Sequence, residues 1–76
     1  MGKLRVLSAN EVCRILTEQG FVKVRQRGSH IMMQLKTDAT TITVPVPNYN
    51  EIRVGTLQSI IRQSGLLRSL FEEYII

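Results

Sequence analysis

The only histidine of this 76-residue chain, His30, follows three cationic residues at alternating positions, Lys23, Arg25 and Arg27. An imidazole exchanges a proton near neutral pH, because its ordinary pKa is about 6.5. A guanidinium stays charged and can hold two phosphate oxygens at once. If the fold brings these groups to one surface, they could move a proton and stabilise negative charge at a phosphodiester.

The dipeptide Gly28-Ser29 predicts a hairpin turn that would bring these side chains to one surface. Glycine adopts the positive φ that a type II′ turn requires at its first central position, and β-prone residues flank the dipeptide on both sides. A two-residue loop fixes the register of the hairpin, and side chains alternate between the faces of a strand. Three cross-strand pairs are therefore predicted on one face: Arg27 with His30, Arg25 with Met32, and Lys23 with Gln34.

Composition and charge favour one small soluble domain, residues 1–76, with a polyanionic partner. The net charge is +4, and the segment from Gly20 to Thr37 contains four cations and no carboxylate. A single cysteine, Cys13, excludes an internal disulfide and fits a reducing cytosol. No apolar run approaches the roughly 20 residues of a membrane span, so the chain is predicted to be cytoplasmic.

Helices are predicted before and after the hairpin in the sequence. The sequence Ser8-Ala9-Asn10-Glu11 matches a capping box, and the helix that it begins is predicted to end at Gly20, with Cys13 as a small core residue. A second helix is predicted over about Val54–Ser64. A short third helix is predicted from the i, i+3, i+4 and i+7 spacing of Leu67, Leu70, Phe71 and Tyr74.

Strands are predicted over Phe21–Arg27, His30–Lys36 and Thr40–Val46. Their alternation places eight apolar residues on one face: Val22, Val24, Ile31, Met33, Leu35, Ile42, Val44 and Val46. An even-length turn around Asp38-Ala39 would pair Leu35 with Ile42 and Met33 with Val44.

Two residues depart from a regular central strand. Phe21 falls on the polar face and is expected to fold over the sheet edge against the first helix. Pro45 cannot donate to a ladder, which predicts an edge strand or the end of pairing.

The predicted fold is α+β in the order α-β-β-β-α-α, after a short lead-in over residues 1–7. Its helices cover the apolar face of a three-stranded antiparallel sheet, and the cationic face stays open.

Several separated motifs occur in an order that resembles the HicA family. The matching residues are Gly20-Phe21, Arg25-Gln26-Arg27-Gly28-Ser29-His30, Thr43-Val44-Pro45-Val46, Gly55-Thr56-Leu57, Ser59-Ile60-Ile61-Arg62-Gln63 and Gly65-Leu66. The resemblance implies a small bacterial toxin that acts as an mRNA interferase and has a double-stranded-RNA-binding-domain-like fold. It also implies neutralisation by a HicB antitoxin and catalysis by the histidine of the Gly-Ser-His turn, here His30. Many relatives carry a second histidine where this chain has Ile31 or Pro47, so the second proton-transfer group is not identified.

RNA carries its own nucleophile, the 2′-hydroxyl, so an enzyme must accept its proton and stabilise charge on the phosphoryl oxygens. His30 is the candidate general base or acid, and the residues expected to bind RNA are Lys23, Arg25, Arg27, Gly28 and Ser29. The expected partners are single-stranded mRNA and a HicB-like antitoxin that masks the open sheet face. One histidine and six scattered acids form no metal-ligand cluster, so the predicted endoribonuclease needs neither metal nor cofactor.

Two other functions fit the same residues. A non-catalytic RNA-binding module of this fold would need no histidine. Separately, the cations, above all Lys23 and Lys36, could form a solvated polar face that keeps the sheet soluble. An interaction protein would instead dock an acidic partner on the open sheet face. Growth arrest on expression of this chain alone, with an acidic open reading frame beside its gene, would favour a toxin over both.

Overall fold

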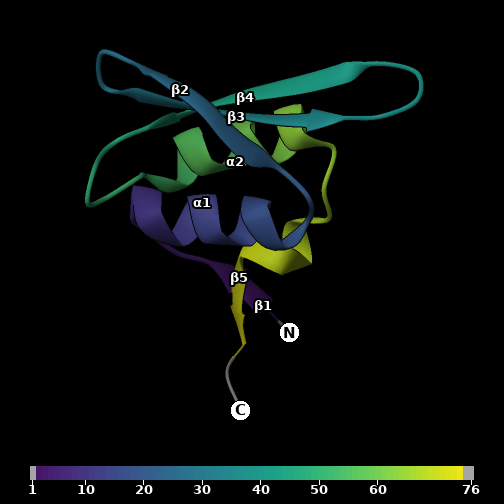
Figure 1. Ribbon diagram of the computed structural model, residues 1–76. Coiled ribbons are helices and arrows are strands. Elements are labelled where there is room, and N and C mark those ends of the chain that lie inside the picture. Colours follow the sequence, from purple (N-terminus) through teal and green to yellow (C-terminus); the bar gives the residue numbers. More distant parts are fainter. Residues whose placement is uncertain (1, 75–76) are drawn as a thin grey trace.

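A three-stranded antiparallel sheet with two helices on one of its faces forms the centre of the computed structural model, which describes residues 2–74 (Figure 1). The elements in chain order are β1 (Gly2–Leu4), α1 (Ala9–Glu18), β2 (Val22–Arg27), β3 (His30–Lys36), β4 (Thr41–Pro47), α2 (Val54–Ser64), the 3₁₀ helix η1 (Arg68–Phe71) and β5 (Glu72–Tyr74). The strand order of the sheet is β2-β3-β4. The predicted α+β class is confirmed. Neither helix in the described part of the chain is both long and apolar enough to cross a membrane.

Local signals at both ends of α1 explain its bounds. Ser8 Oγ accepts from the Glu11 backbone N–H at 3.1 Å, while Glu11 Oε1 accepts from the Ser8 backbone N–H at 3.0 Å, so the predicted capping box is confirmed. At the other end Gly20 has a φ of 100°. The Gly20 N–H donates to the Thr17 carbonyl and the Phe21 N–H to the Leu16 carbonyl, both at 3.0 Å. These two bonds form a Schellman motif, which ends the helix and turns the chain into β2.

The predicted register of β3 and β4 is confirmed. Leu35 pairs with Ile42 and Met33 with Val44. Because these side chains point toward the helices, they join a core that also contains residues of α1 and α2. Its fully buried members include Val12, Leu16, Phe21, Met33, Val44, Val46, Leu57 and Ile60. Pro45 lies on the edge strand β4, where a missing N–H costs no ladder bond.

The N-terminal half of β2 departs from the predicted register. Lys23 pairs with Met33 rather than with Gln34, which pairs instead with Val22, and the register shifts between Lys23 and Arg25. This irregularity at Val24 reverses the alternation of the strand. Val22 and Val24 are therefore 58% and 46% exposed instead of joining the buried face, so their predicted burial is wrong.

The predicted third helix is present, but only as a 3₁₀ helix of four residues, Arg68–Phe71. After α2 ends at Gly65, whose φ is 70°, the chain forms only the 3₁₀ turn η1 and then β5, which pairs with β1. Phe71 is buried, but Leu67 and Leu70 are 72% and 38% exposed, so the apolar spacing does not define one buried stripe. The lead-in before α1 is part of the folded structure, because Leu4 lies in β1 and both Leu4 and Leu7 are buried.

The capping box predicts a pH dependence of stability. The backbone N–H of Ser8 lowers the pKa of the Glu11 carboxyl below its ordinary 4.5, and the Ser8 hydroxyl and Arg5 lower it further. Such a carboxyl contributes stability above its unfolded pKa, and this contribution is lost as the pH falls through the folded pKa. We expect the free energy of unfolding, measured with urea, to decrease below about pH 4.5 more steeply in the parent than in Glu11→Gln. Equal slopes in the two proteins would contradict this role.

Candidate active site on the open sheet face

The hairpin turn between β2 and β3 has the geometry that the Gly-Ser dipeptide predicts. Gly28 has a φ of 58°, and no non-glycine residue among residues 2–74 has a positive φ, so Ser29 has a negative one. These signs match the two central positions of a type II′ turn. A Cβ atom at position 28 would meet no atom within 4 Å apart from those of its two chain neighbours. Backbone conformation, rather than a shortage of space, therefore requires the glycine.

The turn aligns the predicted catalytic histidine with an arginine. His30 pairs with Arg27 on β2 and with Pro47 on β4, and Met32 pairs with Arg25 and Pro45. Residues paired across antiparallel strands share one face of the sheet. A shallow hollow on this face is lined by Arg27, His30, Met32 and Pro45. The structure therefore brings His30, Arg25 and Arg27 to one surface, as predicted.

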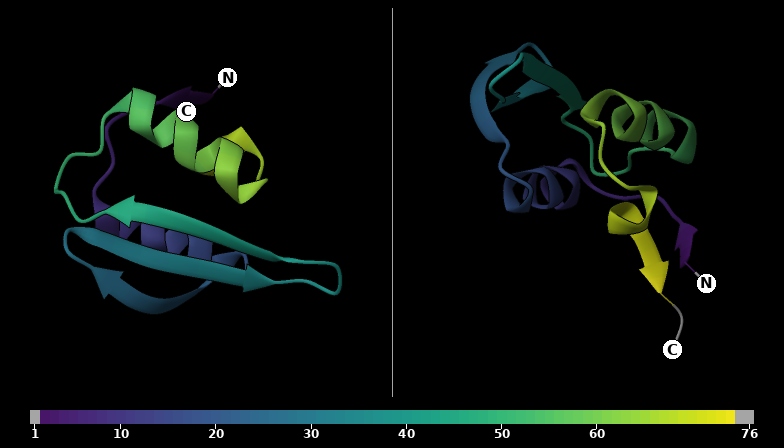
Figure 2. Two further views of the ribbon diagram at one scale, coloured as in Figure 1. Left: turned by 90° about the horizontal axis from the view of Figure 1, so that it is seen from above. Right: turned by 90° about the vertical axis from the view of Figure 1, so that its right-hand side faces the viewer.

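This surface faces away from the helices. Both helices lie on the other side of the sheet, and in the described part of the chain no helix covers the face that carries His30 (Figures 1 and 2). The three strands contain no carboxylate, while His30, Arg25 and Arg27 are all exposed. The open face thus combines an imidazole with two guanidinium groups, a positive charge that suits an anionic ligand.

Lys23 does not belong to this cluster. Its partner Met33 lies on the buried face, so Lys23 belongs to the side of the sheet that faces the helices. Burial raises the pKa of the Cys13 thiol on α1, and the charge of Lys23 lowers it by a smaller amount. Cys13 is half-buried against the core. A protonated, packed thiol agrees with the predicted core role.

The loop that follows β4 is a feature of the site that the sequence did not indicate. The Asn48 backbone N–H donates to the Ser29 carbonyl at 2.6 Å, so the loop lies against the hairpin turn between β2 and β3. The next residue, Tyr49, is 55% exposed. The segment Pro47-Asn48-Tyr49-Asn50 has a loop composition, and an aromatic residue among these polar ones was the only available signal.

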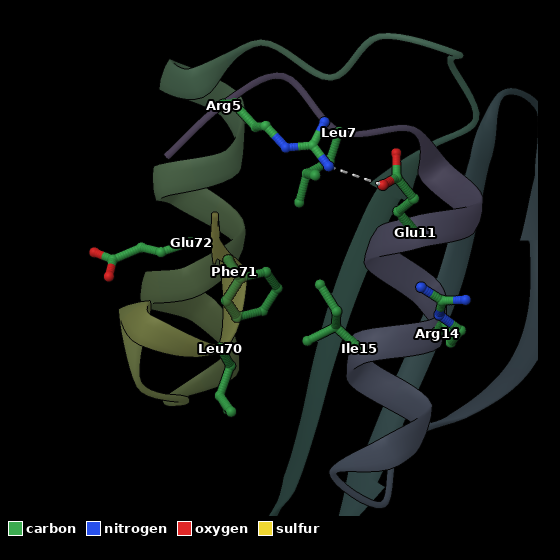
Figure 3. A pocket seen from close by; sticks show the side chains of 8 residues that line it. All are labelled: Arg5, Leu7, Glu11, Arg14, Ile15, Leu70, Phe71 and Glu72. Carbon is green, nitrogen blue, oxygen red and sulfur yellow. Dashed lines mark ion pairs between the residues drawn. The ribbon is translucent and has the colours of Figure 1, made fainter. Parts of the chain in front are cut away.

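A different hollow lies where the two ends of the chain close on α1 (Figure 3). It is lined by Arg5, Leu7, Glu11, Arg14, Ile15, Leu70, Phe71 and Glu72, and none of these belongs to the three-stranded sheet. Figure 3 shows Arg5 reaching Glu11, at 3.6 Å. Glu72 forms a 2.8 Å ion pair with Arg68. Both carboxylates thus have arginine partners, and we assign this region to fastening the chain ends.

The fold and the site define a class of small basic α+β proteins in which an exposed imidazole and two guanidinium groups share an uncovered sheet face. Comparison with protein families identifies the family within this class to which the chain belongs. The model of the HicA toxin of bacterial toxin–antitoxin systems matches residues 9–66, and the chain therefore belongs to the HicA toxin family. A search of curated proteins gave no match.

The family match confirms the predicted resemblance and the assignment to a toxin–antitoxin system, so an antitoxin partner is implied. The matched region begins at the first residue of α1 and ends two residues after α2. It therefore includes the whole open sheet face with its hairpin turn. The strands β1 and β5 and the 3₁₀ helix η1 lie outside it.

Proposed function

We propose that this toxin is an endoribonuclease that cleaves single-stranded mRNA in the cytoplasm, with His30 as its catalytic residue. The observation that carries the proposal is the cross-strand alignment of His30 and Arg27 on the uncovered sheet face. Both side chains are exposed and line the same hollow, so a phosphodiester can reach both at once. Membership of a toxin family supports the proposal, because loss of mRNA would arrest growth.

The reaction divides between the RNA and two protein groups. The RNA 2′-oxygen attacks the adjacent phosphorus, and its proton passes to the imidazole of His30. The bond from phosphorus to the 5′-oxygen breaks, which leaves a 2′,3′-cyclic phosphate and a 5′-hydroxyl. His30 is the only histidine of the chain, so the same imidazole returns the proton to the leaving oxygen. Arg27 holds the non-bridging oxygens as their charge increases.

The remaining predicted residues position the RNA. Arg25 pairs with Met32 one step along the same face and holds a neighbouring phosphate. Gly28 shapes the turn that carries His30, and Ser29 supplies a hydrogen bond from it. Lys23 contributes positive charge only from the helix-covered side of the sheet edge. Because the site is an open surface, a HicB-like antitoxin that covers this face would block both binding and cleavage.

Cleavage of a defined RNA tests the proposed function. The purified toxin, free of antitoxin, is incubated with a labelled single-stranded RNA in the presence of a metal chelator. We expect fragments that end in 2′,3′-cyclic phosphate, and no fragments from RNA whose 2′-hydroxyls are methylated, since the nucleophile is then missing. RNA that binds tightly and stays intact would overturn the proposal and favour a non-catalytic RNA-binding module.

The affinity for RNA should depend on salt. Each phosphate that a cation neutralises on a single strand contributes a slope of roughly −0.7 to the logarithm of affinity against the logarithm of salt concentration. With Arg25 and Arg27 each holding one phosphate, we expect a slope of about −1.4 or steeper for 2′-O-methyl RNA. Arg27→Ala should reduce its magnitude by about 0.7. A flat response would contradict the role of the cationic face.

A further inference from the structure

A second hollow adjoins the proposed cleavage site and has no role in the mechanism above. It is lined by Pro47, Tyr49, Glu51, Ile52, Arg53 and Thr56. Pro47, which lines this hollow, pairs across β3 and β4 with His30, which lines the hollow of the proposed cleavage site. The Cα atoms of such a pair lie about 5 Å apart. A ligand bound at His30 therefore needs only a short extension to enter the second hollow.

The loop that carries Tyr49 is held in place by the backbone. The Asn48 N–H donates to the Ser29 carbonyl at 2.6 Å, and the Tyr49 carbonyl accepts from the Ala9 N–H at 2.9 Å. These bonds fasten the loop to the catalytic turn on one side and to the start of α1 on the other. Tyr49 is nevertheless 55% exposed. A large ring presented to solvent from a fastened backbone is already arranged for binding a flat partner.

The chemistry around the ring suits one nucleotide. Exposed aromatic rings bind single-stranded RNA by stacking on its bases. Arg53 and Thr56 are both exposed and offer a guanidinium and a hydroxyl to a phosphate or ribose. Glu51, also exposed, can accept hydrogen bonds from the amino group of a base. These groups complement the base, ribose and phosphate of a single nucleotide of the RNA.

We propose that this hollow is a subsite for the nucleotide next to the scissile phosphate, with its base stacked on Tyr49 and its phosphate held by Arg53. The inference rests on the proposed function, since it takes RNA as the ligand of the adjoining site. The subsite fixes the position of the RNA strand along the sheet and thereby selects which phosphate reaches His30. Tyr49 acts here through binding and positioning, and its hydroxyl takes no part in proton transfer.

Binding of uncleavable RNA tests the subsite independently of cleavage. The affinity of the parent protein for short 2′-O-methyl oligonucleotides is compared with that of Tyr49→Ala and Tyr49→Phe. We expect Tyr49→Ala to bind about 5- to 150-fold more weakly, the range found for loss of one stacked base, and Tyr49→Phe to bind like the parent. Leu67→Ala, which removes an exposed apolar side chain beyond the other end of α2, should have no effect.

Oligonucleotides that lack a single base identify the stacked position. For one base position, its removal should weaken binding to the parent and leave binding to Tyr49→Ala unchanged, because the base and the ring form one interaction. Loss of affinity in Tyr49→Ala that is equal for intact RNA and every abasic RNA would overturn the subsite, as would no loss at all.

Cleavage assays separate the subsite from the proposed function. With cleavable RNA, Tyr49→Ala should reduce cleavage at low RNA concentration and recover it at saturating RNA. Cleavage that does not depend on Tyr49 would overturn the subsite and leave the proposed function intact. Tyr49-dependent binding without any cleavage would overturn the proposed function and support the subsite. If Tyr49→Phe binds normally but cleaves as poorly as Tyr49→Ala, the hydroxyl takes part in the reaction, which would contradict a role of Tyr49 in binding and positioning alone.

Discussion

Replacing His30 with alanine is expected to reduce RNA cleavage by about 10²- to 10⁴-fold, the usual contribution of a positioned general acid or base. The chain has no second histidine that could substitute for it. The residue is exposed at the start of β3, so its side chain contributes little to packing, and the free energy of unfolding should change by less than about 0.5 kcal/mol. Single-turnover cleavage of a defined RNA measures the first effect, and urea unfolding measures the second.

Binding provides the control for this variant. His30→Ala keeps Arg25 and Arg27, so its affinity for 2′-O-methyl RNA should stay close to that of the parent. Expression of the variant without antitoxin should then permit growth, while the parent arrests it. A purified His30→Ala protein that cuts RNA at the parent's rate would show that another group transfers the proton. Equal growth arrest by both chains would point to toxicity that does not depend on this imidazole.

Short-range signals account for the parts of the structure that the sequence predicts well. The Gly28-Ser29 turn fixes the pairing of Arg27 with His30, because a two-residue loop leaves no freedom of register. The capping box at Ser8 and the left-handed glycines after both helices define helix ends in the same way. Each of these features depends on residues within about five positions of one another. The placement of Arg27 and His30 at the centre of the candidate site is predicted correctly for this reason, since both residues flank the turn.

The irregularity at Val24 could not be predicted from alternation alone. Regular alternation of β2 places Val22 and Val24 in the core and Phe21 outside it, whereas the structure does the reverse. A fully buried phenylalanine gains more from burial than a valine, and the shift at Val24 allows Phe21 to enter the core while Arg25 and Arg27 stay outside. The one visible signal was Phe21 itself, an aromatic residue on the predicted polar face.

The C-terminal segment shows the same limit at longer range. Its apolar spacing is compatible with a helical turn, but β5 pairs with β1, more than sixty positions earlier in the chain. Nothing within the segment itself signals a partner so far away in the sequence. The exposure of Leu67 and Leu70 shows that burial of Phe71 alone is the main packing requirement there. The short 3₁₀ helix η1 satisfies that requirement, and the longer helix predicted from the spacing is not needed.

The shift at Val24 turns two similar cations into a direct test of the site. Arg27 lines the hollow with His30, whereas Lys23 pairs with Met33 on the helix-covered face. We expect Arg27→Ala to reduce cleavage by about 10²-fold at saturating RNA, comparable to the loss of one donor that stabilises transition-state charge. Arg27→Lys should recover only part of this, because an ammonium cannot hold two phosphate oxygens in a fixed plane.

Lys23→Ala removes the same charge from the same strand and is the matched control. Salt screens exposed charges beyond about 8 Å at physiological ionic strength, so a cation on the helix-covered side should change cleavage by less than about threefold. Single-turnover rates for the two alanine variants, measured on one RNA at one salt concentration, give the comparison. Equal losses would mean that net charge rather than position governs the reaction. A larger loss in Lys23→Ala would place the phosphate on the other side of β2, away from His30, and would contradict the proposed site.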